Sequence, residues 1–389
     1  MNPQRLKIRL GALACAIICS MASCSYVSPP KEEASALHQS TTIEDANALL
    51  KRSKQLTKNN EVAAVYQLRA AEIAWNLLDT DGGRVKNISN LNESQKQAIQ
   101  VLKTAAEELA ENFVDSKYQP VKEFNHAGFS YQINAAAASQ TGVHTLDNLT
   151  AIKPVSEVRH RLCNQWHTTD GIGAPLASKW KRPTDPKVAR FVSSRSYMNS
   201  FTAVLSFDKT KKSGAPKSAS LVGYDPSYIS KIQLGQTEYP LAADFTSTMV
   251  DQTSDIHEFR LALKGLIHPG EIDAKLISLE HYDPNRIPVL FVHGLNSHPL
   301  MWRNVINNLR ADPKLRGRYQ FMIFYYPTAW PISYSSLRLR QELAAWEATV
   351  GTPKKMVLVG HSMGACFPEC RPSIQSEKSG TKLLEKAVT

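Results

Sequence analysis

The chain has 389 residues, enough for two or three domains, and its 42% hydrophobic and 21% charged residues are ordinary values for a globular protein. This composition excludes a chain that is disordered over most of its length and a protein that crosses a membrane many times. The net charge of +11 is spread along the chain without a dense block of lysine and arginine, so we expect no nucleic-acid partner.

Residues 1–23 have the three parts of a secretory signal peptide. Basic residues come first, and an apolar run from Leu10 to Ile18 follows that is too short to span a bilayer comfortably. The segment ends in Met21-Ala22-Ser23-Cys24, which resembles the lipobox of bacterial lipoproteins. The resemblance implies cleavage before Cys24 and lipidation of its thiol, and the alternative is an ordinary cleaved signal with a soluble product.

Two or three acyl chains on Cys24 would hold the protein stably at a membrane, which becomes its partner through the anchor. Ser25 resembles the signal that sorts lipoproteins to the outer membrane. We therefore expect a lipid-anchored protein of the bacterial cell envelope, on the outer membrane and facing the periplasm. Residues 24–41 are polar and contain Pro29-Pro30, so they are predicted to be a tether.

Residues 42–115 are predicted to be helical, because their apolar residues recur every three or four positions, as in Ala98, Ile99, Leu102 and Ala105. Asp81-Gly82-Gly83 interrupts the pattern. The helix pairs resemble tetratricopeptide stacking but show no self-similar period, and a small helical bundle that packs on the rest is the alternative. A protein partner of this helical region is possible under either interpretation.

Residues 116–284 are predicted to form an antiparallel β-rich domain whose function the sequence does not indicate. Short β-branched or alternating runs lie between Pro, Gly, Asn and Asp clusters, at Phe129–Ile133, Phe201–Phe207, Lys231–Leu234 and Phe259–Leu263. Ser194, His160 and Asp170 occur here, but scattered residues of these types are found in almost any chain of this length.

Residues 285–364 alternate between buried-strand and helix patterns. The predicted strands are Ile287–Gly294, Tyr319–Tyr326 and Met356–Gly360, and the predicted helices are Pro299–Arg310 and Leu337–Val350. Continuous apolar runs are typical of parallel strands that are buried on both faces. The alternation therefore predicts a parallel sheet with right-handed crossovers.

The last predicted strand leads directly into Gly360-His361-Ser362-Met363-Gly364, which matches the pattern Gly-x-Ser-x-Gly. A nucleophile on a sharp strand-to-helix turn needs strained backbone angles, and glycines two residues away on either side prevent clashes. The serine then projects above the sheet and faces the N-terminus of the next helix. The alternative interpretation is a buried glycine-rich turn with an inert serine.

With Phe291-Val-His-Gly-Leu-Asn296, this motif resembles the α/β-hydrolase fold, specifically its bacterial lipase and esterase members. The expected fold class is α/β, a partial α/β-hydrolase parallel sheet at the C-terminus preceded by the helical region and the β-rich domain. The resemblance implies that Ser362 attacks the carbonyl of an acyl ester or lipid substrate. It also implies an oxyanion hole from the backbone N–H groups of Met363 and Leu295, with His293, Gly294 and His361 as structural motif residues.

The family order places an acidic residue and then a histidine after the serine. Only 27 residues follow Ser362, and they contain no histidine and no aspartate. An earlier histidine such as His298 could act only outside the family order. Loss of a triad member costs several orders of magnitude in rate, so the chain is expected to be inactive or barely active. The alternative function is a lipid-anchored envelope binding protein that carries a degenerate hydrolase domain.

Residues 365–389 are predicted to be an aberrant, disordered tail. Pro368 and Pro372 would stop the helix expected after the turn, and a polar stretch follows. Codons read one base earlier would permit Gly-Val-Leu-Ser-Arg-Met, a plausible helix start. This suggests a single-base deletion near Gly364, which the genomic DNA would rule out if it held no long open frame downstream.

The six cysteines predict neither a disulfide framework nor a metal site, because none lies at ligand spacing from a histidine. Cys366 and Cys370 are four residues apart, but two cysteines without further ligands are more often incidental. We expect no metal and no other cofactor.

Overall fold

The computed structural model describes residues 31–56, 61–78, 88–114, 120–138, 145–158, 162–208, 216–254 and 256–367. The predicted signal peptide, Cys24, His160 and residues 368–389 lie outside these ranges. Within them no helix is long and apolar enough to cross a membrane. The fold is mixed α/β, with helices packed against two separate sheets.

Four helices open the described chain: α2 (Lys31–Gln39), α3 (Ile43–Ser53), α4 (Glu61–Leu77) and α5 (Glu93–Glu111), with a 3-10 turn η2 (Ile88–Asn90) before α5. Helix α3 begins with a capping box between Thr42 and Asp45, and α5 begins with one between Asn92 and Gln95. The prediction of a tether up to residue 41 is wrong over α2, because Leu37 is buried in the core and the His38 ring bonds to the Ala127 carbonyl oxygen.

A six-stranded sheet follows, in the order β1 (Val121–His126), β2 (Phe129–Ala138), β7 (Lys217–Tyr224), β6 (Ser200–Phe207), β5 (Ala174–Trp180) and β3 (Leu149–Pro154). The prediction of an antiparallel domain holds for four of its pairings, but β2 and β7 are parallel. Strand β7 pairs antiparallel with β6, which precedes it in the chain. Its other neighbour, β2, is distant in sequence and runs in the same direction as β7.

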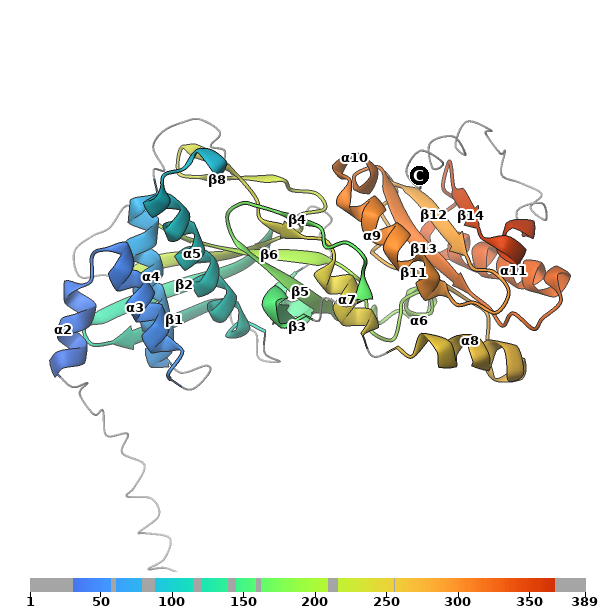
Figure 1. Cartoon of the computed structure of the whole chain (residues 1–389), viewed down its shortest axis with the longest axis horizontal. Coiled ribbons are helices and arrows are strands. Elements are labelled where there is room, and N and C mark those ends of the chain that lie inside the picture. Colours follow the sequence, from blue (N-terminus) through green and yellow to red (C-terminus); the bar gives the residue numbers. More distant parts are fainter. Residues whose placement is uncertain are drawn as a thin grey trace, which may run out of the picture.

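The helices cover one face of this sheet, as Figure 1 shows for α3, α4 and α5. One continuous core joins them, with Leu68 and Leu109 from the helices and Tyr131, Ile133 and Leu221 from the strands. The helical region and the β-rich region therefore bury their apolar faces against each other. No tetratricopeptide-like stack is needed to cover α4, most of whose residues are buried.

Shorter elements lie between the strands of this sheet or between this sheet and the second one. They are η3 (Leu146–Asn148), η4 (Val155–Glu157), β4 (Thr168–Thr169), α6 (Pro186–Ala189), β8 (Lys231–Leu234), β9 (Thr237–Pro240), β10 (Ala243–Asp244), α7 (Ser247–Thr253), α8 (Glu258–Ile267) and η6 (Pro269–Glu271). The strand predicted at Phe259–Leu263 is wrong, since it lies inside α8. Most of its residues, including Glu, Arg, Leu, Ala and Lys, are good helix formers.

The second sheet has the order β11 (Lys275–Ser278), β13 (Tyr319–Tyr325), β12 (Ile287–Val292) and β14 (Val357–Gly360). Strands β13, β12 and β14 are parallel, as predicted, whereas β11 is antiparallel to β13. The sheet thus begins before the predicted boundary at residue 285. Strand β11 has only four residues, which are too few for a recognisable strand pattern, so this pairing was not predicted.

Helices lie on both faces of the second sheet, and Figure 1 shows α9 and α11 on opposite sides. The helical elements are η7 (Pro299–Trp302), α9 (Arg303–Ala311), α10 (Pro313–Arg316), α11 (Ile332–Val350) and η8 (Ser362–Cys366). Along β12, Leu290 and Val292 face the α11 core, while Val289 and Phe291 face the α9 core. This double burial is what continuous apolar strands require.

The two parts meet through the segment before β6. The Met198 N–H donates to the Leu279 carbonyl oxygen at 2.8 Å, and the Ser278 N–H donates to the Phe191 carbonyl oxygen at 2.7 Å. The fully buried Arg310 guanidinium donates to the Met198 carbonyl oxygen. These contacts cover the β11 edge of the second sheet. The molecule is elongated, with α2 at one end and α11 and β14 at the other (Figure 1).

Candidate nucleophile site

Ser362 lies where β14 ends and the chain turns into η8. Strand β14 pairs in parallel with β12, which places Gly360 opposite Val292. His361 has extended backbone angles, and Ser362 then has φ +54°, in the left-handed region. That region is unfavourable for a residue with a Cβ atom. The predicted sharp corner is therefore present, and the Ser362 side chain is exposed.

The two glycines of the motif lie in backbone that leaves no room for a side chain. A Cβ atom on Gly360 would lie 2.5 Å from the Gly364 carbonyl oxygen. A Cβ atom on Gly364 would lie 2.6 Å from the carbonyl oxygens of Val292 and His293. Both contacts are with backbone atoms, which cannot move aside as easily as the end of a flexible side chain can. The spacing Gly-x-Ser-x-Gly is thus a steric requirement of this corner.

The loop after β12 packs against the same corner. A Cβ atom on Gly294 would lie 2.9 Å from the His361 carbonyl oxygen and 3.0 Å from the Ser362 Cβ atom. The His361 N–H donates to the Val292 carbonyl oxygen at 3.1 Å. Gly294 therefore lets the two loops approach, and the structure brings together the two motifs that the sequence suggested.

His293 is fully buried beneath this loop. Burial lowers the pKa of its imidazole to about 4, so the ring is neutral at neutral pH. The ring stacks on Tyr326 with 4.4 Å between centroids, and the Tyr326 hydroxyl donates to the His293 carbonyl oxygen at 2.7 Å. Tyr326 thus supports the loop, a role that the sequence did not indicate because the residue reads only as the end of a strand.

Within the described chain, the Ser362 hydroxyl makes no hydrogen bond, and no imidazole pairs with it. His361 directs its ring toward Gly294 and Trp302, with 6.5 Å between the His361 and Trp302 ring centroids. His298 lies close enough to His293 to contribute to the lowering of its pKa. The sequence-predicted nucleophile is therefore placed without a base among these residues.

The two residues predicted to stabilise an oxyanion flank the serine. Met363 is half-buried, and Leu295 is exposed in the loop that contacts Ser362 through Gly294. Across the described ranges, neither the Met363 N–H nor the Leu295 N–H has a hydrogen-bond acceptor. Both groups are thus available as donors beside the serine.

The prediction of a disordered tail from residue 365 is wrong for its first three residues. Ala365 and Cys366 belong to η8, and Phe367 is buried with its ring centroid 5.1 Å from that of Tyr326. An apolar side chain that follows the turn at once can fill the space under the sheet whatever comes after it.

Cys366 is exposed and Cys163 is half-buried, and both are free thiols. Burial raises the pKa of the Cys163 thiol. In the part of the chain that the structure describes, no group of three or more His, Cys, Asp or Glu residues could hold a metal ion. Cys370 lies outside those residues. No protein-family model, no curated protein and no solved structure matches the chain.

Proposed function

We propose that Ser362 is the nucleophile of a serine hydrolase that cleaves carboxylic esters or lipids through an acyl-enzyme. The carrying observation is the left-handed Ser362 between two glycines whose missing side chains leave room for neighbouring backbone. Strain of this kind on a non-glycine residue clusters at functional sites. The second sheet, with helices on both faces and the serine after a parallel strand, supports a partial α/β-hydrolase fold.

In this mechanism, the serine hydroxyl attacks the acyl carbonyl while the Met363 and Leu295 N–H groups stabilise the oxyanion. The attack needs a base to take the hydroxyl proton. His293 is buried away from that role, and the described residues supply no other base to Ser362. We therefore expect this chain to be inactive or barely active, because the hydroxyl proton has no acceptor among these residues.

A fluorophosphonate probe with free imidazole as an added base tests this proposal. Wild type should label slowly and faster with imidazole, because a soluble base replaces the missing side chain. Ser362→Ala should not label under either condition, whereas Ser297→Ala, a nearby serine on the loop after β12, should label like wild type. The measurement is the labelling rate followed by intact mass.

Equal labelling of wild type and Ser362→Ala would show that another residue reacts. No labelling of wild type even with imidazole would show that Ser362 is inert. Either outcome removes the hydrolase proposal.

A second candidate is a lipid-anchored envelope binding protein with a degenerate hydrolase domain. The observation behind it is that the helices and the six-stranded sheet, which share one core, lie apart from the sheet that leads to Ser362, so they leave room for a second role. An experiment in the host cell distinguishes the two proposed functions. A biological role that survives Ser362→Ala supports the binding protein, and its loss in a stably folded Ser362→Ala variant supports the enzyme.

We also propose that Cys24 carries the lipid and that the protein resides in the bacterial cell envelope. The lipobox-like Met21-Ala22-Ser23-Cys24 and the preceding signal-type segment support this. An outer-membrane location facing the periplasm rests on Ser25.

A further inference from the structure

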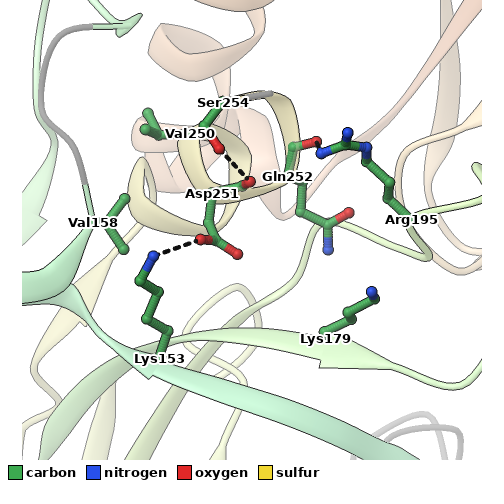
Figure 2. Close-up of a pocket in the computed structure, with 8 residues that line it drawn as sticks. All are labelled: Lys153, Val158, Lys179, Arg195, Val250, Asp251, Gln252 and Ser254. Atoms are coloured by element: carbon green, nitrogen blue, oxygen red, sulfur yellow. Dashed lines mark hydrogen bonds and ion pairs between the residues drawn. The ribbon is translucent and has the colours of Figure 1, made fainter. Parts of the chain in front are cut away.

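The described part of the chain contains a cavity of about 340 Å³ between the six-stranded sheet and α7, which Figure 2 shows. Three of its four charged side chains contact neighbours within the protein. Lys153 pairs with Asp251 at 3.2 Å, and Arg195 Nη1 donates to the Gln252 carbonyl oxygen at 3.3 Å. These contacts hold the wall of the cavity together without a ligand. The apolar side chains that the fold leaves in water lie elsewhere.

Exposed apolar side chains gather in the part of the molecule that holds the second sheet. Of the nine large apolar residues that are exposed in the described chain, seven lie after residue 260. Three of them, Leu263, Leu266 and Ile267, belong to α8, and the other four follow β12 or lie at the start of α11. Single apolar side chains on a surface are ordinary, whereas a group of them marks a site of interaction.

Helix α8 contacts the molecule through the side that holds Gly265. This residue is buried, and a Cβ atom on it would lie 3.8 Å from the Pro327 Cα atom in the segment after β13. Positions two residues apart on an α-helix point to nearly opposite sides. Leu263 and Ile267 therefore point away from the molecule, and Ile267 is 57% exposed. Neither residue belongs to the apolar clusters that the described residues form.

The exposed side of α8 is amphipathic. Leu263, Leu266 and Ile267 are three or four positions apart, which places them in one apolar stripe along the helix. Arg260 and Lys264 are exposed and one turn apart, in a row beside this stripe. A helix of this pattern lies in the plane of a membrane interface, where its apolar side chains enter the lipid and its long cations reach the headgroups.

The position of α8 relative to α2 favours a bilayer as the occupant of this surface. Figure 1 shows both helices along the same long edge of the molecule, the lower one in this view. If Cys24 carries a lipid, as proposed above, the six residues between it and α2 span at most about 20 Å. The bilayer then lies close to α2, and a bilayer that follows this edge meets α8 further along it.

We propose that α8 lies in the interface of the lipid bilayer and holds the molecule along the membrane surface. The apolar stripe enters the lipid, and Arg260 faces the headgroups of anionic lipids. Lys264 pairs with Glu271 at 3.2 Å and adds less charge to this surface. The orientation of the molecule rests on the proposed lipid anchor, but the inference does not depend on the activity of Ser362.

Hydrogen exchange followed by mass spectrometry tests the proposal on full-length protein bound to vesicles of phosphatidylcholine and phosphatidylglycerol. The backbone amides of α8 should exchange at least about tenfold more slowly in wild type than in a double variant with Leu266→Gln and Ile267→Gln. Transfer of one such side chain from water into lipid favours the bound helix by about that factor. Leu77→Gln changes a leucine of the same 38% exposure at the end of α4 and should behave like wild type.

Equal exchange of α8 in vesicle-bound wild type and double variant would overturn the proposal. Exchange of wild-type α8 that slows with rising protein concentration in the absence of vesicles would also overturn it, because a second copy of the chain would then be the occupant. Cys24→Ala bound at excess vesicles should show the same protection of α8. Since exchange is measured on bound molecules, failure of the lipid anchor lowers the amount of bound protein but not this protection.

Discussion

Within the Gly-x-Ser-x-Gly motif, the backbone strain lies at a single residue, Ser362. Its left-handed backbone costs about 1 kcal/mol for a residue with a Cβ atom. The cost persists because strand β14, the Gly294 loop and η8 together fix the corner. An exposed side chain that contributes no hydrogen bond within the described residues offers nothing to stability in return.

We therefore predict that Ser362→Gly raises the free energy of unfolding by up to about 1 kcal/mol, since glycine adopts this conformation without strain. Ala365→Gly is the matched control in the same short helix, at negative φ, and should lower the free energy of unfolding by roughly 0.5–1 kcal/mol. Urea denaturation measures both. Destabilisation by Ser362→Gly equal to that of the control would show that the corner is not strained.

Much of the site was predictable because its motif consists of five consecutive residues, 360–364. The steric need for Gly360 and Gly364 and the turn at Ser362 follow from local geometry. Tyr326 was not predictable, because its bond to His293 joins residues 33 positions apart. The cavity residues Lys153 and Asp251 are 98 positions apart and form no recognisable pattern in sequence.

At the scale of elements, the apolar runs of β12, β13 and β14 gave the correct strands because strands buried on both faces are continuously apolar. Short elements could not be recognised in the sequence. Strand β11 has four residues, and the helix-or-strand ambiguity of a short apolar run explains the error at α8. The parallel pairing of β2 with β7 depends on chain topology rather than on either strand's sequence.

The docking of α4 on the six-stranded sheet depends on a partly buried ionic cluster. Glu72 on α4 pairs with Arg69 at 3.0 Å, accepts a hydrogen bond from the Tyr131 hydroxyl at 2.7 Å and pairs with Lys217 on β7. Burial opposes ionisation of Glu72, but hydrogen bonds from Lys217 and Tyr131, with the charges of Lys217 and Arg69, lower the pKa of this carboxyl overall.

We predict that Glu72→Gln lowers the free energy of unfolding by about 2 kcal/mol, because a buried cluster loses its only acid while Lys217 can still reach water. Wild type should also lose stability as the pH falls below 4.5, the ordinary pKa of this carboxyl, and through its lowered folded-state pKa. The variant should lack that part of the loss.

Denaturation at several pH values measures both effects. Glu123→Gln, an exposed acid on β1, should change neither stability nor its pH dependence appreciably. A pH dependence of Glu72→Gln identical to that of wild type would contradict the role of the cluster.

At the scale of the whole molecule, the junction between the two parts was not predictable. Arg310 and the Met198 carbonyl oxygen that it contacts are 112 positions apart, and an isolated arginine in a helix pattern is usually solvated. The predicted envelope location, in contrast, depends only on the first residues of the chain.

If Cys24 is lipidated, Cys24→Ala should move the protein from the membrane fraction to the soluble fraction of the cell envelope, because the acyl chains are attached at this one residue. Cys19→Ala, a second cysteine of the same leader, should leave the protein in the membrane fraction. Fractionation with immunoblotting measures both, and an unchanged distribution of Cys24→Ala would exclude the anchor.

The elongated shape limits which substrates a lipid anchor at Cys24 would place near Ser362. The six residues between Cys24 and α2 reach about 20 Å at full extension. Helix α2 stands at one end of the long axis, while β14 leads to the serine at the other (Figure 1). A molecule that stands upright on its bilayer would hold the serine away from the surface, among soluble esters. Only a molecule lying flat could turn it toward lipids of the same leaflet.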